Sequence, residues 1–117
     1  MVISEQSRII ANSSFSELMC EYMNNNIYST LTLKDLCSHF FLGKTQLCKI
    51  FRENTGKSPM EYYAELKISE AKKLLRENER SVSQISDSLG YSSIHIFSRA
   101  FKKAVGMSPK SYKNTIM

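Results

Sequence analysis

Two stretches of the sequence, fifty residues apart, carry hydrogen-bonding and basic side chains at helical spacing. In the first stretch these residues are Thr45, Cys48, Lys49 and Arg52. The same register in the second stretch holds His95, Ser98, Arg99 and Lys102. Short polar groups followed by a cation on each later turn suit a helix that contacts base edges and phosphates in the major groove of duplex DNA. The pattern therefore predicts two DNA-reading helices.

The opposite side of each stretch is mostly apolar. It carries Leu47, Ile50, Phe51 and Asn54 in the first stretch, and Phe97, Ala100, Phe101 and Ala104 in the second. Residues spaced three and four apart share one side of a helix, so these sets predict the core-facing sides of two amphipathic helices. The fifty-residue offset continues downstream, where Gly56 matches Gly106 and Ser58-Pro59 matches Ser108-Pro109. The chain is therefore predicted to contain a duplicated unit.

Upstream of these helices the offset is forty-nine residues. There Thr32, Leu33, Leu36 and Phe40 match Ser81, Val82, Ile85 and Leu89. One additional residue is therefore expected in the second unit between Leu89 and Ser93, because a bend between helices tolerates an insertion. The pairs Thr32-x-x-Asp35 and Ser81-x-x-Gln84 resemble capping boxes, and they predict where the first helix of each unit begins.

Further start and stop signals define the remaining elements. Ser14-x-x-Glu17 predicts the start of the first helix, and Ser58-Pro59 predicts a long helix that ends near Asn78. Gly56 and Gly106 are expected helix stops. The predicted fold is all-α, with about seven helices in a homeodomain-like tandem. Its parts are an N-terminal lead segment (1–14) and a domain (15–114) that contains a first helix-turn-helix (32–55), a linker helix (59–78) and a second helix-turn-helix (81–105).

The charge of the chain favours a polyanionic partner. The 117 residues carry a net charge of +5. Most of the excess lies after residue 80, where five basic residues face a single acid, Asp87. No apolar run approaches the length of about 20 residues that a membrane-spanning helix needs. Three cysteines in an unpaired pattern argue against a disulfide framework, so a reducing cytoplasm is the expected location.

The chain resembles the AraC/XylS family of bacterial regulators over about residues 15–114, and the second unit is the most specific part of the match. The resemblance rests on Ser83–Ser93, Phe97–Lys103 and Gly106–Tyr112, and it extends to Leu66-Lys67-Ile68 with Ala71 and Leu74-Leu75 in the linker helix. It implies a seven-helix fold with two helix-turn-helix motifs joined by a long helix. It also implies transcription regulation, for which we expect activation rather than repression, with double-stranded promoter DNA and RNA polymerase as partners.

The resemblance also suggests roles for individual residues. The implied base-reading residues are Thr45, Gln46, Cys48 and Lys49 in the first unit, and Ser93, Ile94, His95, Ser98 and Arg99 in the second. The implied phosphate contacts are Lys44, Arg52, Lys102 and Lys103. Phosphate contacts supply salt-dependent affinity, whereas contacts to base edges carry sequence information.

Five residues depart from the family's usual pattern. Phe41 stands where a glycine is usual, and Gly43-Lys44 stands where Ser-Pro usually begins the second helix. Lys67 replaces a usual arginine, and Ile96 replaces a common tyrosine. Because Phe41 and Gly43-Lys44 alter the bend of the first unit, we expect the second helix-turn-helix to carry more of the affinity.

Three other classes of protein compete with a DNA-binding regulator as interpretations of this sequence. An enzyme is not expected, because His39 and His95 are the only histidines and no phosphate loop or catalytic triad emerges. No cofactor is expected either. A metal or redox sensor could use Cys37, His39 and Cys48, but Cys37 falls at a core position, which favours a buried thiol and no metal site. A helical adaptor could present the same basic faces to an acidic protein.

The sequence shows no segment that predicts a sensor domain. About 14 residues precede the first predicted helix, so the chain is interpreted either as a small stand-alone regulator or as the C-terminal piece of a longer one. No small-molecule effector is expected to bind within it. Two reading helices on one chain favour a monomer, because a linker helix of roughly 30 Å can hold them about one turn of DNA apart.

Overall fold

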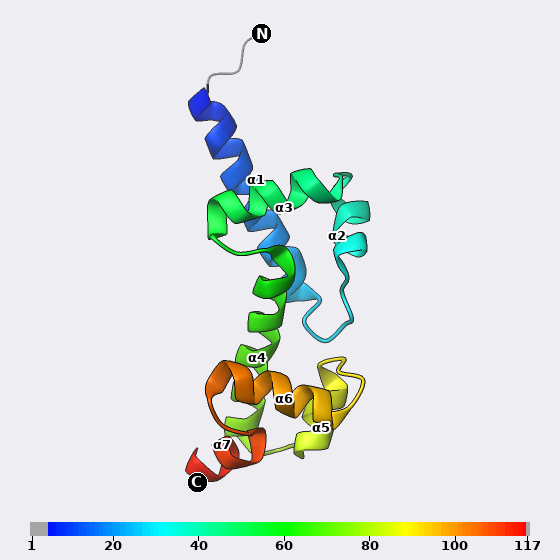
Figure 1. The fold of residues 1–117 in the computed structure, drawn as a ribbon, viewed down its shortest axis with the longest axis vertical. Coiled ribbons are helices and arrows are strands. Elements are labelled where there is room, and N and C mark those ends of the chain that lie inside the picture. The colour runs from blue at the N-terminus through cyan, green and yellow to red at the C-terminus, as the bar shows by residue number, and fades with distance from the viewer. Residues whose placement is uncertain (1–4, 117) are drawn as a thin grey trace. The chain divides into compact units, whose positions relative to one another are not determined.

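The computed structural model describes the backbone of residues 5–116 and the side chains of residues 14–115. Over that range the chain forms seven helices and no strand (Figure 1). They are α1 (Glu5–Asn25), α2 (Leu33–Phe40), α3 (Lys44–Thr55), α4 (Pro59–Glu77), α5 (Val82–Ser88), α6 (Ile94–Val105) and α7 (Pro109–Ile116). The predicted all-α fold of about seven helices is confirmed.

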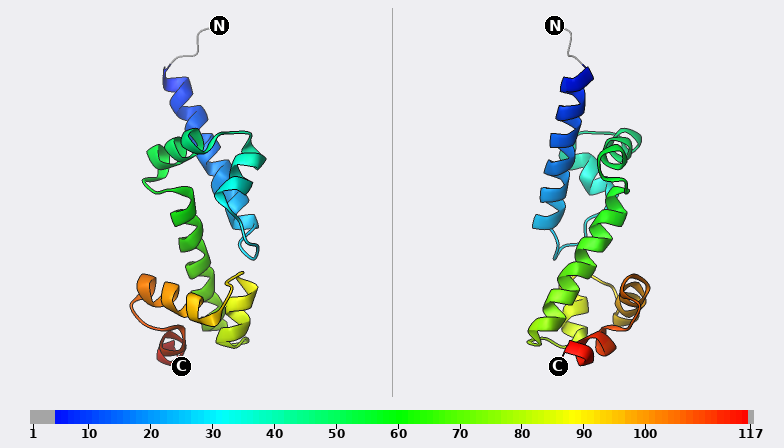
Figure 2. Two further views of the ribbon diagram at one scale, coloured as in Figure 1. Left: turned by 45° about the vertical axis from the view of Figure 1, so that its right-hand side comes forward. Right: turned by 90° about the vertical axis from the view of Figure 1, so that its left-hand side faces the viewer.

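The helices belong to two compact units. Unit 1 contains the chain up to Asn26 together with Leu31–Tyr63, and unit 2 contains Ile27–Thr30 together with the chain from Ala64 onward. The first helix-turn-helix (α2 and α3) therefore lies in unit 1, and the second (α5 and α6) lies in unit 2. Within each unit the second helix of the motif lies across a long helix, α1 for α3 and α4 for α6 (Figure 2).

The start of the first helix differs from the prediction. The sequence suggested a start at Ser14, but α1 begins at Glu5. The residues between them include glutamate, glutamine, arginine and alanine, which favour helix, and no glycine or proline that would stop it. Much of the predicted lead segment is thus helical, and its residues 1–4 lie outside the described part of the chain.

The capping boxes that begin the two motifs are both present. At α2, the Thr32 hydroxyl accepts a hydrogen bond from the Asp35 amide (3.2 Å), and the Asp35 carboxylate accepts one from the Thr32 amide (2.9 Å). At α5, Ser81 and Gln84 make the same reciprocal pair, at 3.1 and 2.9 Å. These bonds use backbone N–H groups that a helix start leaves unpaired. The hydrogen bonds from the Thr32 amide and hydroxyl also lower the pKa of Asp35.

The core of each unit is built on the predicted apolar sides, with two exceptions. Leu47 and Phe51 of α3 are fully buried, as are Phe97 and Phe101 of α6. In unit 2 they pack with residues of α4 and α5, including Ala71, Leu75, Ile85 and Leu89. Asn54 and Ala104, predicted to face the core, are exposed because they lie in the last turns of α3 and α6, beyond the buried phenylalanines.

The turns between the paired helices differ in length and conformation. In unit 1, Phe41 adopts a left-handed conformation (φ 55°, ψ 41°), and α3 begins two residues after Leu42. In unit 2, the left-handed residue is Gly90 (φ 79°), and α6 begins at Ile94. The second turn is therefore one residue longer after the left-handed position, which confirms the predicted insertion between Leu89 and Ser93.

The ends of α3 and α6 follow the sequence signals. Gly56 and Gly106 terminate α3 and α6 in left-handed conformations, with φ of 77° and 94°. The Ser58 hydroxyl then accepts from the amide of Glu61 at the start of α4. Among the described residues, no helix is long and apolar enough to cross a membrane.

Candidate nucleic-acid interface

The predicted contact residues of unit 1 gather on one side of α3. Lys44, Thr45, Gln46, Lys49 and Arg52 are exposed, whereas Cys48 is half-buried. All of these except Gln46 line one shallow hollow of about 390 Å³. The side of α3 that faces away from Leu47 and Phe51 is therefore a continuous polar and basic surface, although Cys48 sits deeper in it than its neighbours.

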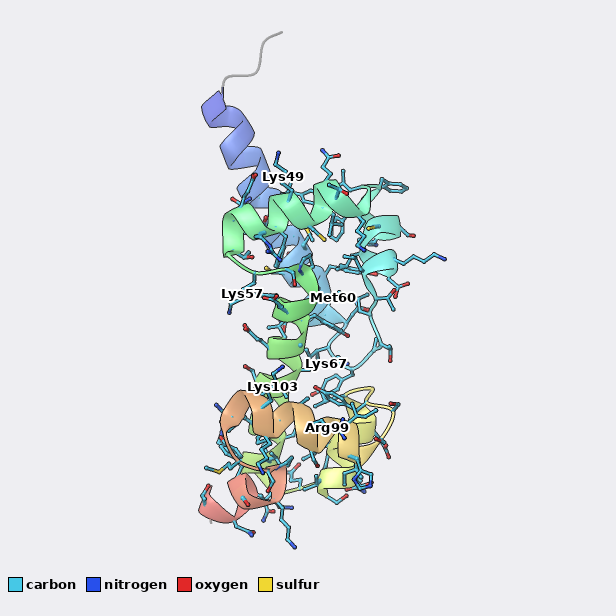
Figure 3. All side chains as sticks on the ribbon, in the orientation of Figure 1. Lys49, Lys57, Met60, Lys67, Arg99 and Lys103 are labelled. Carbon is cyan, nitrogen blue, oxygen red and sulfur yellow. The ribbon has the colours of Figure 1, made fainter. Side chains whose placement is uncertain are left out.

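The predicted contact residues of unit 2 form the matching side of α6. His95, Arg99, Lys102 and Lys103 are exposed, and Ser98 is half-buried. Figure 3 shows Arg99 and Lys103 on α6 and Lys49 on α3. No hydrogen bond or ion pair within the described part of the chain uses the side chains of Arg99, Lys102 or Lys103. These three cations are therefore free to meet an external anion.

The first turns of the two recognition helices have different chemistry. The N-cap of α3 is Gly43, which makes no side-chain capping bond. The N-cap of α6 is Ser93, whose hydroxyl accepts a hydrogen bond from the Ile96 amide at 3.1 Å. The predicted base-reading residue Ser93 thus has an observed capping role, and it is half-buried. Ile94, the other flanking residue of the prediction, is 37% exposed.

Charge separates the two surfaces further. The α3 surface carries three cations, Lys44, Lys49 and Arg52, but the exposed Glu53 lies beside them. Fifty residues later the corresponding position is Lys103, and α6 contains no acidic residue. The α6 surface is therefore uniformly basic, whereas the α3 surface is mixed. A polyanion would be attracted more strongly to α6.

The candidate metal ligands of unit 1 do not come together. His39 stacks on Tyr22, with ring centroids 3.9 Å apart. Cys37, which the sequence placed in the core, is half-buried, and all three cysteines are free thiols. Within the described residues no group of three or more histidine, cysteine or acidic side chains is arranged to hold a metal ion.

Comparison with known proteins agrees with this geometry. A family described as a helix-turn-helix domain matches residues 36–115, which cover most of the first motif, the linker helix and the whole second motif. The chain belongs to the AraC-type helix-turn-helix family. The family is one of DNA-binding transcription regulators and not of enzymes.

Individual relatives of this AraC-type domain include an uncharacterized HTH-type transcriptional regulator, YobQ, of Bacillus subtilis. It is 33% identical over 103 residues, which are 88% of this chain and 43% of that protein. This chain therefore spans less than half the length of that relative. The solved C-terminal domain of AraT, a response regulator from Geobacillus stearothermophilus, is 27% identical with a TM-score of 0.83, covering 87% of this chain and 85% of its own.

An AraC-type DNA-binding domain protein from Chromobacterium violaceum is similar as well. Its structure is 26% identical with a TM-score of 0.79, and the match covers 91% of this chain and 96% of that one. The tandem arrangement of two helix-turn-helix motifs is thus shared with solved AraC-type domains.

Two residues of the AraC-type surface were missed by the sequence prediction. Ile96 is 49% exposed on α6, and its register partner fifty residues earlier is Gln46, which the prediction did include. An exposed apolar side chain at this point suits contact with a thymine methyl group. Glu53 was also overlooked, although it shares its register with the predicted Lys103. Strict use of the fifty-residue offset finds both residues.

Proposed function

We propose that this domain binds double-stranded DNA with sequence specificity, by placing α3 and α6 in the major groove. The observation that carries the proposal is the repetition of one exposed surface in one register. Thr45 and His95 lie near the start of each helix, and Lys49 and Arg99 follow one turn later. A single basic helix side is commonly just solvated. Two in the same register, each following a capped helix and a bend, favour a shared ligand.

The proposed division of labour follows the chemistry of the side chains. Arg99 and Lys49 suit guanine, whose major-groove edge offers two acceptors, while Thr45, Gln46, His95 and Ser98 can donate to or accept from base edges. Lys44, Arg52, Lys102 and Lys103 suit phosphates. Cys48, Ser93 and Ile94 complete the predicted base-reading set, with Ser93 contributing while it caps α6.

The second helix-turn-helix is proposed to supply more of the affinity than the first. Its surface combines Arg99, Lys102 and Lys103 with no acidic neighbour, whereas Glu53 opposes an anion at α3. An arginine also forms a bidentate pair with guanine that a lysine cannot reproduce.

At the level of the cell, we propose that the chain serves a bacterial transcription regulator of the cytoplasm. Activation of a promoter, which we favour over repression, would bring RNA polymerase into contact with the DNA-bound domain. We also propose that one copy suffices for binding, because each chain carries two recognition helices.

The test is selection of bound sequences from a random duplex library at two salt concentrations. We expect an enriched motif with two parts. Arg99→Ala should weaken binding by about 1–3 kcal/mol, or about 5- to 150-fold, and relax the preference at one base pair. Lys103→Ala should weaken binding to all sequences alike and reduce the salt dependence.

Lys73→Ala is the matched control, because Lys73 is an exposed lysine of α4 that pairs with Glu70 at 3.8 Å and belongs to neither recognition helix. If Arg99→Ala and Lys103→Ala bound every duplex as the wild type does, the proposal of DNA reading by α6 would be wrong. Enrichment of no sequence by the wild type would instead favour an adaptor that presents the same surfaces to an acidic protein.

A further inference from the structure

A buried lysine lies behind the second recognition helix. Lys67 of α4 is only 8% exposed, although it carries an ammonium group (Figure 3). Its Nζ donates to the backbone carbonyl of Ser29 at 2.8 Å and to the backbone carbonyl of Leu89. Burial lowers the pKa of this amine. Burying a cation is costly unless hydrogen bonds replace its water, so these two carbonyls are what allow Lys67 to lie there.

The ammonium contacts Leu89 and Tyr91, which flank Gly90 in the turn between α5 and α6. It binds the carbonyl of Leu89, the residue that ends α5. It lies 5.8 Å from the centre of the Tyr91 ring, within the range of a cation–π contact. Between them, a Cβ on Gly90 would lie 3.3 Å from the same Nζ. The turn at Leu89, Gly90 and Tyr91 therefore packs closely against the Lys67 side chain.

The position of the charge suits the end of a helix. The last carbonyls of α5 have no partner within the helix, and the helix dipole places partial negative charge at that end. Lys67 supplies both a donor and a positive charge there. An apolar side chain of similar length would remove this donor from both carbonyls. The cost is greatest at the Leu89 carbonyl, whose bond to Lys67 is buried.

We infer that Lys67 is a positioning residue for DNA reading by the second helix-turn-helix. By binding the turn from α4, it sets the direction in which α6 leaves the turn and so the placement of His95 and Arg99. The inference rests on the proposed function of α6. Lys67 itself is buried and does not meet DNA.

The first helix-turn-helix lacks this device. At the matching turn the residue before the left-handed position is Phe40, and its ring packs edge-to-face on Phe15 with centroids 5.1 Å apart. The next residue, Phe41, is 92% exposed. An aromatic contact thus takes the place of the ammonium. A change at Lys67 should therefore disturb reading by α6 and leave reading by α3 in place.

The experiment repeats the random-duplex selection with Lys67→Met, Lys67→Arg and the exposed control Lys73→Met. Arg99→Ala identifies which part of the motif α6 reads. We expect Lys67→Met to flatten the preference in that same part, to retain the other part, and to lower affinity about tenfold, as for loss of one charge-assisted hydrogen bond. Lys67→Arg, which keeps a cation and donors, should restore most of the preference. Lys73→Met should match the wild type.

Each outcome distinguishes the inference from the proposed function. A wild type that enriches no motif overturns the proposed function. If the wild type selects a two-part motif and Lys67→Met selects the same motif, the inference about Lys67 is wrong and the proposed function stands. The same conclusion follows if Lys67→Met loses the preference in both parts equally. If Lys67→Met still selects the part of the motif that α3 reads, the variant is folded. If it does not fold, Lys67→Gln, which keeps a neutral donor, must show the same one-sided loss.

Discussion

The two turns that precede the recognition helices perform the same task with different chemistry. In the first, Phe41 adopts a left-handed conformation with its ring in solvent, and Gly43 begins α3 without a side-chain cap. In the second, Gly90 takes the left-handed position, Lys67 binds the carbonyl before it, and Ser93 caps α6. A duplicated motif can therefore keep its shape in both copies while different contacts stabilise the turn in each: the Phe40 ring packs on Phe15 in the first, and the Lys67 ammonium binds the Leu89 carbonyl in the second.

The reading surfaces differ in the same direction. The helix without a side-chain N-cap, α3, carries Glu53 among its cations, and the capped helix, α6, carries Lys103 at the matching position. Precise placement matters most where directional contacts are made. If α6 makes more of the directional base contacts, as we propose, it depends more on the exact geometry of its turn than α3 does. The comparison thus links the contacts that hold each turn to the contribution to DNA sequence specificity that we propose for the helix that follows it.

The largest expected effect on stability comes from Gly90→Ala. Its φ of 79° is strained for alanine, and the new Cβ would lie 3.0 Å from Oγ1 of Thr30. We expect a loss of about 2 kcal/mol in the free energy of unfolding. Urea denaturation of the variant measures it. An unchanged midpoint would mean that the second turn is as permissive as the first, and the contrast between the turns would fail.

The reciprocal change, Phe41→Gly, should stabilise the protein. Glycine adopts the left-handed conformation without strain, and the Phe41 side chain is too exposed to contribute packing. We expect a gain of about 1 kcal/mol, reduced by the greater freedom of glycine in the unfolded chain. Urea denaturation again provides the measurement. A loss of stability would show that the ring makes contacts that hold the first turn together.

Acid should weaken the start of the first motif and spare the second. Hydrogen bonds from Thr32 lower the pKa of Asp35 in the folded protein. The ionised Asp35 carboxylate therefore stabilises the start of α2 fully above its ordinary pKa of about 3.9, and this stabilisation is lost as the pH falls through the lowered pKa. Gln84, at the matching position of α5, does not titrate. Amide hydrogen exchange from pH 5 to pH 3 should show opening of α2 relative to α5, with Asp35→Asn as the control. Equal opening of both helices would contradict the assignment.

The smallest effect is expected from Gly43→Ser. A Cβ at Gly43 meets nothing within 4 Å, so a serine hydroxyl can cap α3 as Ser93 caps α6. We expect a gain of a few tenths of a kcal/mol, because glycine is itself a tolerated N-cap. The measurement is the thermal midpoint. A lower midpoint would indicate that the backbone at Gly43 needs the freedom of glycine.

Much of the fold was predictable because it depends on local signals. Thr32, Ser58 and Ser81 marked helix starts, and Gly56 and Gly106 marked helix ends, since caps act within a few residues. The fifty-residue offset predicted the exposed polar and basic sides of α3 and α6. The start of α1 was missed because Ser14 resembles a cap, although nothing before it stops a helix.

Other features could not be predicted, because they depend on contacts between residues distant in the sequence. Nothing local to Lys67 indicates that its ammonium meets the carbonyls of Ser29 and Leu89. The half-buried state of Cys37 and the exposure of Asn54 likewise follow from where the packed elements end. The burial of Lys67 behind the second turn could be seen only in the three-dimensional structure.

The central claim is that the two recognition helices read DNA unequally. The most direct test compares Lys49→Ala with Arg99→Ala, the matched positions of α3 and α6, by measuring affinity for the selected duplex at one salt concentration. We predict a loss of about 5- to 150-fold for Arg99→Ala and a clearly smaller loss for Lys49→Ala. An equal loss for the two variants, or a greater loss for Lys49→Ala, would contradict the account.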